Sequence, residues 1–211
     1  MIRKLFLAAA MLQLTINPVS AQTLTVEELR AQIDARVEQM NPYAELLNDP
    51  DPERSMAAMQ IMLESGDDVL KDMALEFGLL SPNPSVRRTA FEAYLATGPN
   101  LTVQVDGSAI SNASLYTSRI EDLGGTVGAD NAGFFRLPTG AFDAEKSCYT
   151  SKSEDNCLIV SNGDGVFLSY RIGCCASGNG RGVLVEDGTI KGTLSLEDIE
   201  AVLPFVVQVI R

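Results

Sequence analysis

Apolar side chains recur at helical spacing between residues 25 and 97. Thr25 stands three positions before Glu28, in the S/T-x-x-E pattern of a capping box, and a regular apolar series follows. Its members are Leu29, Ile33, Val37 and Met40. Intervals of three and four residues mark one face of an amphipathic helix. We therefore predict a helix that begins at the capping box and ends at Asn41-Pro42.

Two segments that each open with a proline-bounded turn repeat at an offset of 32 residues. Pro50-Asp51-Pro52-Glu53 aligns with Pro82-Asn83-Pro84-Ser85. The same offset aligns Ala58 with Ala90, Met59 with Phe91, Leu63 with Leu95 and Gly66 with Gly98. Each turn precedes a predicted helix, and a further helix over 69–80 follows the first. Paired helices at such a period are typical of a helical solenoid, although a small helical bundle also fits two units.

The second of these helices resembles a known repeat family. Residues 84–95 read PSVRRTAFEAYL, which is similar to the first helix of a HEAT repeat, with its pattern P-x-V-R-x-x-A-x-x-A-L. The resemblance covers about residues 48–97 and implies helical hairpins that bind another protein. The earlier unit departs from the pattern, with Arg54 and Ser55 where Val and Arg are expected. Arg87 and Arg88, a basic doublet in an acidic region, are the candidate partner-binding residues; a solvated repeat face is the alternative.

Beyond residue 100 the pattern changes to short runs that alternate in polarity or are rich in β-branched residues. The predicted strands are 101–105, 157–160, 166–172, 182–186, 190–196 and 202–210. Turn residues separate several of them, and this spacing predicts an antiparallel β domain, built as a sandwich or as a strongly bent sheet. This half resembles no family that we identify. The fold class is thus α+β, with a HEAT-like helical region over 22–99 and a β-rich, disulfide-braced domain over 100–211.

The first 21 residues have the layout of a secretory signal peptide. Arg3 and Lys4 precede a short apolar core, and Val19 and Ala21 occupy the positions that precede a cleavage point. The alternative is a buried N-terminal helix. The apolar run is shorter than the about 20 residues that a membrane span needs, and no later segment is long and apolar enough. We therefore expect an exported protein without a membrane span, in the periplasm or outside the cell.

The composition removes several classes of function. The 211 residues include no His and no Trp, and 16 basic residues face 28 acidic ones, for a net charge of −12. Without His, the Ser-His-Asp and Cys-His catalytic units and the H-E-x-x-H zinc helix are excluded. An acidic chain repels a phosphate backbone, so we expect no nucleic-acid partner.

Four cysteines lie in the predicted β domain: Cys148, Cys157, Cys174 and Cys175. In an exported chain an even number favours disulfides. We favour a bond between Cys148 and Cys157, which leaves the adjacent pair to each other or to another chain. In the competing pattern, Cys174 and Cys175 bond separately to the other two. The spacings do not match paired zinc knuckles, so we expect no metal site.

The sequence contains no catalytic motif that passes its structural requirements. The segment 177–182, SGNGRG, lacks the third Gly of a dinucleotide loop, and we interpret it as a flexible loop between two strands. Residues 162–165, NGDG, lack the ligands of a calcium loop, and we interpret them, like residues 187–189, as a turn. We expect neither a cofactor nor a catalytic residue. The leading hypothesis is an exported, non-enzymatic interaction or adaptor protein that uses the HEAT-like surface. The alternatives are a small-ligand binding module around residues 174–181 and a carboxylate-dependent hydrolase.

Overall fold

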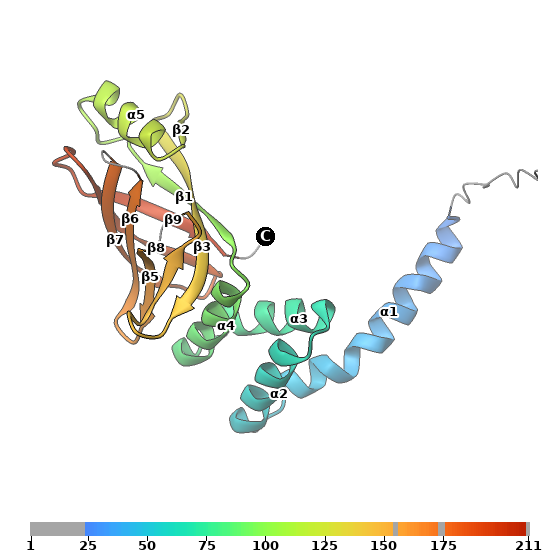
Figure 1. Ribbon diagram of the computed structural model, residues 1–211. Helices are drawn as coiled ribbons and strands as arrows, with labels where there is room; N and C mark the ends of the chain where they lie inside the picture. Colours follow the sequence, from blue (N-terminus) through green and yellow to red (C-terminus); the bar gives the residue numbers. More distant parts are fainter. Residues whose placement is uncertain (1–23, 154–155, 173–175, 210–211) are drawn as a thin grey trace, which may run out of the picture. The chain divides into compact units, whose positions relative to one another are not determined.

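The computed structural model describes residues 24–153, 156–172 and 176–209 (Figure 1). The chain divides into one unit up to Asn41 and a second unit from Pro42 onward. The predicted signal peptide, residues 1–21, lies outside the described residues. Within the described part the fold is α+β, because four helices precede a β-barrel and a fifth helix follows the first strand.

The first helix, α1 (Val26–Leu47), begins at the predicted capping box. The Thr25 N–H donates to Glu28 Oε2 (2.9 Å), and the Glu28 N–H donates to Thr25 Oγ1 (3.2 Å). The bond from the Thr25 main chain holds the pKa of the Glu28 carboxyl below its ordinary value. The helix passes through Pro42, where the sequence predicted its end. Burial of Leu47 offsets the main-chain hydrogen bond that a proline cannot make.

Three further helices pack in sequence, α3 against α2 and α4 against α3. They are α2 (Pro52–Glu64), α3 (Asp68–Leu79) and α4 (Pro84–Ala96). Their contact is close because Gly78 of α3 has no side chain. A Cβ there would lie 2.4 Å from Ala90 Cβ and 2.7 Å from Met59 Sδ, which is nearer than such atoms can approach. The crossing of these helices therefore requires a glycine at position 78.

The strands and the fifth helix follow in chain order. They are β1 (Asn100–Asp106), α5 (Ala113–Asp122), β2 (Thr126–Val127), β3 (Ala132–Asp143), β4 (Cys148–Ser151), β5 (Cys157–Asn162), β6 (Gly165–Ile172), β7 (Ala176–Leu184), β8 (Thr189–Leu196) and β9 (Leu203–Gln208). The neighbour order is β1-β9-β8-β7-β6-β5-β4-β3, all antiparallel, and β1 also pairs with β3. This last pairing closes an eight-stranded barrel, and β2 adds one extra strand beside β3.

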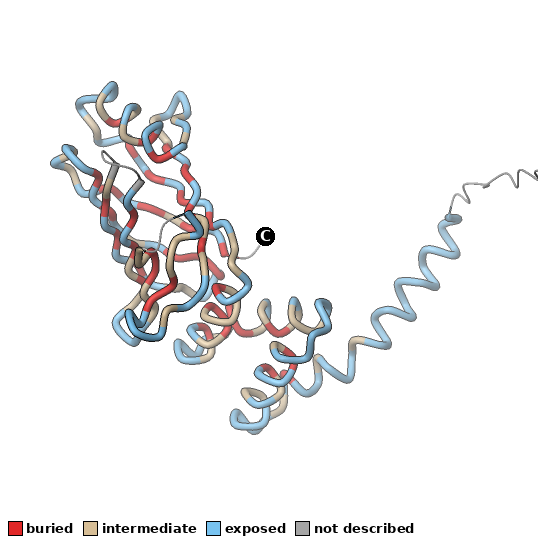
Figure 2. Tube along the Cα trace, in the orientation of Figure 1, coloured by how far each residue is buried: buried red, intermediate tan, exposed pale blue. Residues whose placement is uncertain are grey.

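Alternating burial along the strands separates the barrel interior from its outer surface (Figure 2). In β1 the buried residues are Leu101, Val103 and Val105, with exposed residues between them. Phe135 of β3 and Tyr170 of β6 meet with ring centroids 5.3 Å apart. The interior is thus filled by large apolar side chains, as expected of a small barrel.

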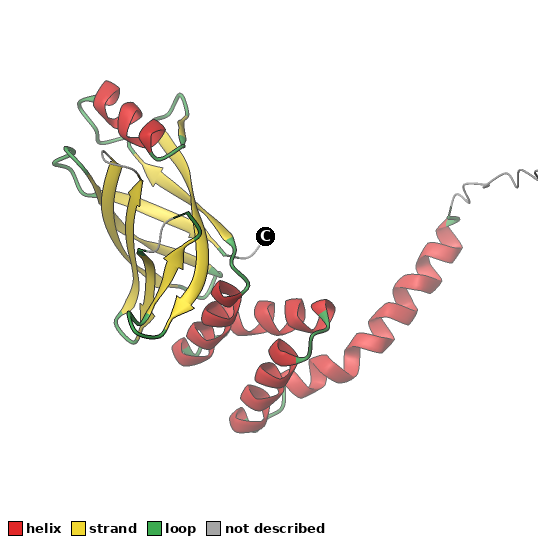
Figure 3. Cartoon of the chain, in the orientation of Figure 1, coloured by secondary structure: helices red, strands yellow, loops and turns green. Residues whose placement is uncertain are grey.

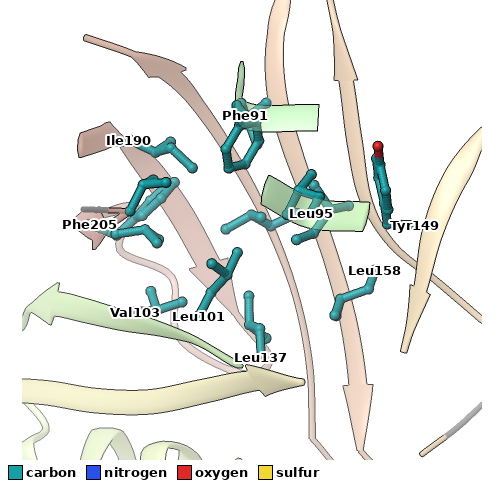
Figure 4. Close-up of a cluster of buried hydrophobic side chains, with 14 of the residues drawn as sticks. Phe91, Leu95, Leu101, Val103, Leu137, Tyr149, Leu158, Ile190 and Phe205 are labelled. Atoms are coloured by element: carbon teal, nitrogen blue, oxygen red, sulfur yellow. The ribbon is translucent and has the colours of Figure 1, made fainter. Parts of the chain in front are cut away.

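Two helices close the opposite ends of the barrel (Figure 3). At one end α4 contributes Phe91 and Leu95, both fully buried among side chains of the strands (Figure 4). At the other end α5 contributes Tyr116 and Ile120, which are also fully buried. Each helix is amphipathic, and the barrel rim covers its apolar face.

The closed barrel is a specific form of the antiparallel β domain that the sequence predicted. The hairpins at the β5–β6 and β7–β8 turns lie where turn residues were found. The glycine-rich segment 177–182 was interpreted as a loop, and this is wrong, because these residues lie in β7. Two of its glycines face neighbours that leave no room for a side chain: a Cβ at Gly178 would lie 2.1 Å from the Tyr170 hydroxyl, and one at Gly182 would lie 2.9 Å from Ile190 Cγ2. The sequence did not predict α5, β2, β3 or β4.

Candidate functional site

A cleft of about 750 Å³ lies beside the first half of α4, at the end of the barrel that α4 closes. Its walls come from α4, from the β5–β6 turn and from the β7–β8 turn. The lining residues are Pro84, Ser85, Arg87, Arg88, Phe91, residues 161–166, residues 183–187 and Lys191. We call this site the α4 cleft. Its volume lies in the range of roughly 300–1,000 Å³ that is typical of binding pockets.

Helix α4 holds its place at the cleft through its cap and its buried face. Asn83 is the N-cap and accepts a hydrogen bond from the Ser85 N–H (2.9 Å), and Pro84 occupies the first helical position. Phe91 points into the barrel end (Figure 4). Arg88 and Glu92, four residues apart, form an ion pair on the helix surface. The same amphipathic helix therefore closes the barrel and supplies one wall of the cleft.

Arg87 is a positioning residue at the junction of the helices and the barrel. Its side chain is buried, although a guanidinium is normally exposed. The Nε atom donates to the Leu184 carbonyl (3.2 Å), and Nη1 donates to the Ser81 carbonyl. Glu186 Oε1 lies 3.9 Å from Nη1. Arg87 thus joins the loop before α4 to the end of β7, and its predicted contact with a partner stays a prediction.

Arg88 is the member of the doublet that faces solvent in the cleft, with 43% of its side chain exposed. Its Nε atom lies 3.7 Å from Glu92 Oε1, a surface pair that stabilises little. Its Nη1 atom lies 3.8 Å from the place that a Cβ on Gly163 would take, so the guanidinium reaches toward the β5–β6 turn. Arg88 remains the candidate partner-binding residue.

The opposite wall of the cleft carries a surface ion pair between two of its own side chains. Lys191 Nζ lies 2.5 Å from Asp187 Oδ2, and Thr189 donates to the same carboxylate through its hydroxyl and its N–H. The hydrogen bond from Lys191, followed by that from Thr189, lowers the pKa of Asp187 to about 2. A general acid at neutral pH needs a raised pKa, so Asp187 is unsuited to that role. Asp187 is instead an anion that accepts hydrogen bonds from Thr189 and Lys191 and so fixes the β7–β8 turn.

A second hollow of about 400 Å³ adjoins the α4 cleft and shares Ser161 and Asn162 with it. Glu92, Phe142 and Tyr149 are among its lining residues, and we call it the Phe142 hollow. Phe142 is 54% exposed, and its ring meets Tyr149 with centroids 5.1 Å apart. The Tyr149 hydroxyl donates to the Glu92 carbonyl (2.9 Å), and burial raises the pKa of this tyrosine. An exposed aromatic ring thus packs on Tyr149, which is bonded to the main chain of α4.

The predicted disulfide between Cys148 and Cys157 is confirmed, with Cα atoms 5.7 Å apart. It joins β4 to β5, next to the Phe142 hollow. The competing pattern is wrong, because it requires these two cysteines to bond elsewhere. Cys174 and Cys175 lie outside the described residues. A small-ligand module around residues 174–181 therefore rests on a segment that is only partly described, and its described part belongs to β7.

The described residues also bear on metal sites and on membrane spans. No group of three or more Cys, Asp or Glu side chains there is arranged to hold a metal ion. None of the helices in the described ranges has the length and apolar character to cross a membrane.

The sequence pointed to one wall of the site and missed the other two. Arg87 and Arg88 were singled out, and both line the α4 cleft. The NGDG segment and the turn after residue 186 were interpreted only as turns, although they form the other walls. No local pattern places a hairpin turn beside a helix that lies about 75 to 100 residues earlier, because that proximity depends on barrel closure.

Comparison of the chain with protein-family models, with curated proteins and with solved structures finds no match. The site must therefore be interpreted from its own geometry.

Proposed function

We propose that this protein is an exported, non-enzymatic interaction protein whose partner docks at the α4 cleft. The proposal rests on the concave shape of the α4 cleft. The cleft presents one partly exposed cationic side chain and one exposed apolar side chain. Arg88 supplies the cation, and Val183, 53% exposed at the end of β7, supplies the apolar contact. Phe91 fixes the helix that carries Arg88, because its ring is fully buried in the barrel end.

A HEAT-like arrangement of the helices is part of this proposal. Helices α2 and α4 each have 13 residues, and each begins with a capping residue followed by proline. Helix α3 packs against both of them. These features support the interpretation of residues 48–97 as related helical hairpins, a class of structure that binds proteins. In this proposal the partner approaches the surface of α4 that faces away from the barrel interior.

Export to the periplasm or the extracellular space is supported by two features. The layout of residues 1–21 is that of a secretory signal. The Cys148–Cys157 disulfide is of a kind that persists in oxidising compartments and is rare in reducing ones.

The test is affinity capture from the compartment that holds the protein, with matched variants as bait. Val183→Asp places a charge in the cleft, whereas Val202→Asp places the same charge at a side chain that is 61% exposed and does not line the cleft. Likewise, Arg88→Met is matched by Arg54→Met, which removes a surface arginine of α2. We expect the cleft variants to lose the partner by about tenfold or more and the controls to retain it. Equal recovery on all baits, or no partner on the wild-type chain, would overturn the proposal.

Binding of a small ligand in the same cleft is the second candidate function, favoured by the volume of about 750 Å³. Native mass spectrometry of the protein from its own compartment distinguishes the two. A bound mass of a few hundred daltons that Val183→Asp removes would favour the ligand. If no such mass is bound and a protein is captured instead, the interaction role is favoured.

A further inference from the structure

We propose that the occupant of the α4 cleft is an extended segment of a partner polypeptide, in which an acidic side chain stands near apolar ones. The segment runs from the α4 cleft into the Phe142 hollow. This inference rests on the proposed function, because it names the chemistry of the partner at the same site.

The continuity of the two hollows favours an extended chain over a compact ligand. Ser161 and Asn162 line both hollows, so the second begins where the first ends. Arg88 lines the first hollow and Glu92 the second, and the two are joined as an i, i+4 ion pair on α4. The groove therefore follows the helix, as a bound strand-like segment requires.

Exposed apolar side chains at two separate points of the groove provide anchors. Val183 is 53% exposed in the α4 cleft, and Phe142 is 54% exposed in the Phe142 hollow. Aromatic anchors in rigid hollows carry a large share of interface energy. The edge contact with Tyr149 supports one side of the Phe142 ring and leaves the rest of it exposed for a partner. A bound segment with two apolar residues places one against Val183 and the other against Phe142.

Arg88 selects a carboxylate between these anchors. Arg87 is engaged with main-chain carbonyls, and Lys191 with Asp187. Within the described ranges, the Nη atoms of Arg88 have no hydrogen-bond partner, and its single contact is the 3.7 Å pair with Glu92. A planar guanidinium with free Nη donors matches a carboxylate in two parallel hydrogen bonds. An acidic side chain of the partner therefore competes effectively with Glu92.

The surroundings limit the occupant to one or few negative charges. Asp164, Glu186 and Asp187 line the same cleft, and the whole chain carries a net charge of −12. A polyanion such as a nucleic acid or an anionic lipid surface would be repelled by this field. A single carboxylate within an otherwise apolar segment satisfies Arg88 without that penalty.

Gly163 provides a steric test that leaves every charge in place. Its φ does not lie in the left-handed region, and a Cβ there would meet only Arg88 Nη1, at 3.8 Å. A larger side chain therefore fits the fold and projects toward Arg88. Gly163→Leu should obstruct the groove at the point where the acidic side chain binds.

The experiment is selection of a phage-displayed random dodecapeptide library on the full chain, with Arg88→Met as counter-selection. We expect enriched peptides that combine Asp or Glu with apolar residues. By fluorescence anisotropy, Arg88→Met and Gly163→Leu should each weaken the enriched peptide about tenfold or more, Arg88→Lys less, and Val202→Asp not at all. Thermal unfolding of each variant confirms that it is folded.

The outcomes separate this inference from the proposed function. If a captured partner depends on Val183 but no acidic-apolar peptide is enriched, or enriched peptides bind Arg88→Met equally well, the inference fails and the proposed function stands. If enriched peptides carry no acidic residue, the inference also fails. If neither partner nor peptide depends on the cleft, both fail.

Discussion

Helices α2 and α4 begin with similar capping residues but pack against different parts of the molecule. Their capping residues, Asp51 and Asn83, have nearly the same backbone angles, φ −83° and ψ 113° against φ −83° and ψ 116°. Met59 of α2 aligns with Phe91 of α4, and both are fully buried. Met59, however, packs at the helix crossing beside Gly78, whereas Phe91 enters the barrel end (Figure 4). Similar capping and apolar spacing thus fix which position is buried, but not what buries it.

The difference extends to the outer faces of the two helices. At the position of Arg88 in α4, the repeat offset places Met56 in α2. Among the described residues, α4 adjoins the β5–β6 and β7–β8 turns and lines the α4 cleft, whereas α2 lines neither this cleft nor the Phe142 hollow. One helix of the repeat becomes a candidate binding site because the barrel turns supply the other walls of a cleft.

The largest effect should come from removing the two aligned core side chains. Phe91→Ala should lower the free energy of unfolding by about 3–5 kcal/mol and Met59→Ala by about 2–5 kcal/mol, measured by urea denaturation. Hydrogen exchange should then accelerate in β8 and β9 for Phe91→Ala, and in α2 and α3 for Met59→Ala. Ile61→Ala, at a side chain 68% exposed, should change stability by less than about 0.5 kcal/mol. The same exchange pattern in both variants would contradict the comparison.

Gly78→Ala tests the point where α3 contacts both helices. A Cβ at this position overlaps Ala90 of α4 and Met59 of α2. Alanine favours an isolated helix by about 1 kcal/mol, but overpacking costs about 1–3 kcal/mol. We expect a net loss of about 1–2 kcal/mol in urea denaturation. Gly163→Ala is the control at an open site, and a stabilised Gly78→Ala variant would show that the helices do not cross there.

The two caps should contribute equally if the helix starts are equivalent. Asp51→Ala and Asn83→Ala each remove one hydrogen bond to a main-chain N–H, of 2.9 Å in both cases. Each should destabilise the protein by about 1 kcal/mol in thermal unfolding, and the matching Gly variants by only a few tenths. A cap whose loss has no effect would show that its helix start is held by packing alone.

The smallest effect concerns two surface ion pairs, one beside α2 and one in the α4 cleft. Arg54 lowers the pKa of Asp49 by a hydrogen bond, and Lys191 lowers that of Asp187 to about 2. The depressed pKa of Asp187 contributes stability that is present above about pH 4 and is lost as the pH falls through about 2. An NMR titration should place the Asp187 midpoint near 2, and Lys191→Met should raise it. An unchanged midpoint in that variant would exclude Lys191 as the cause.

Local patterns predicted the four helices that precede the barrel, two hairpin turns and one disulfide. Thr25 and Glu28 form the predicted capping box, since a cap depends only on residues three apart. The extent of α1 was missed, because burial of Leu47 outweighs the effect of Pro42. Segment 177–182 was mistaken for a loop, since Gly178 reflects close packing against Tyr170 and not a turn.

The sequence by itself determined the acidic charge, the absence of histidine and the α+β division. These follow from composition and from periods of two to four residues. Only the tertiary structure decided that β1 pairs with β3, that Phe91 seals the barrel, and that the β5–β6 and β7–β8 turns stand opposite Arg88. The physical reason is that these contacts join distant segments, and their free energy is gained only when the whole barrel closes.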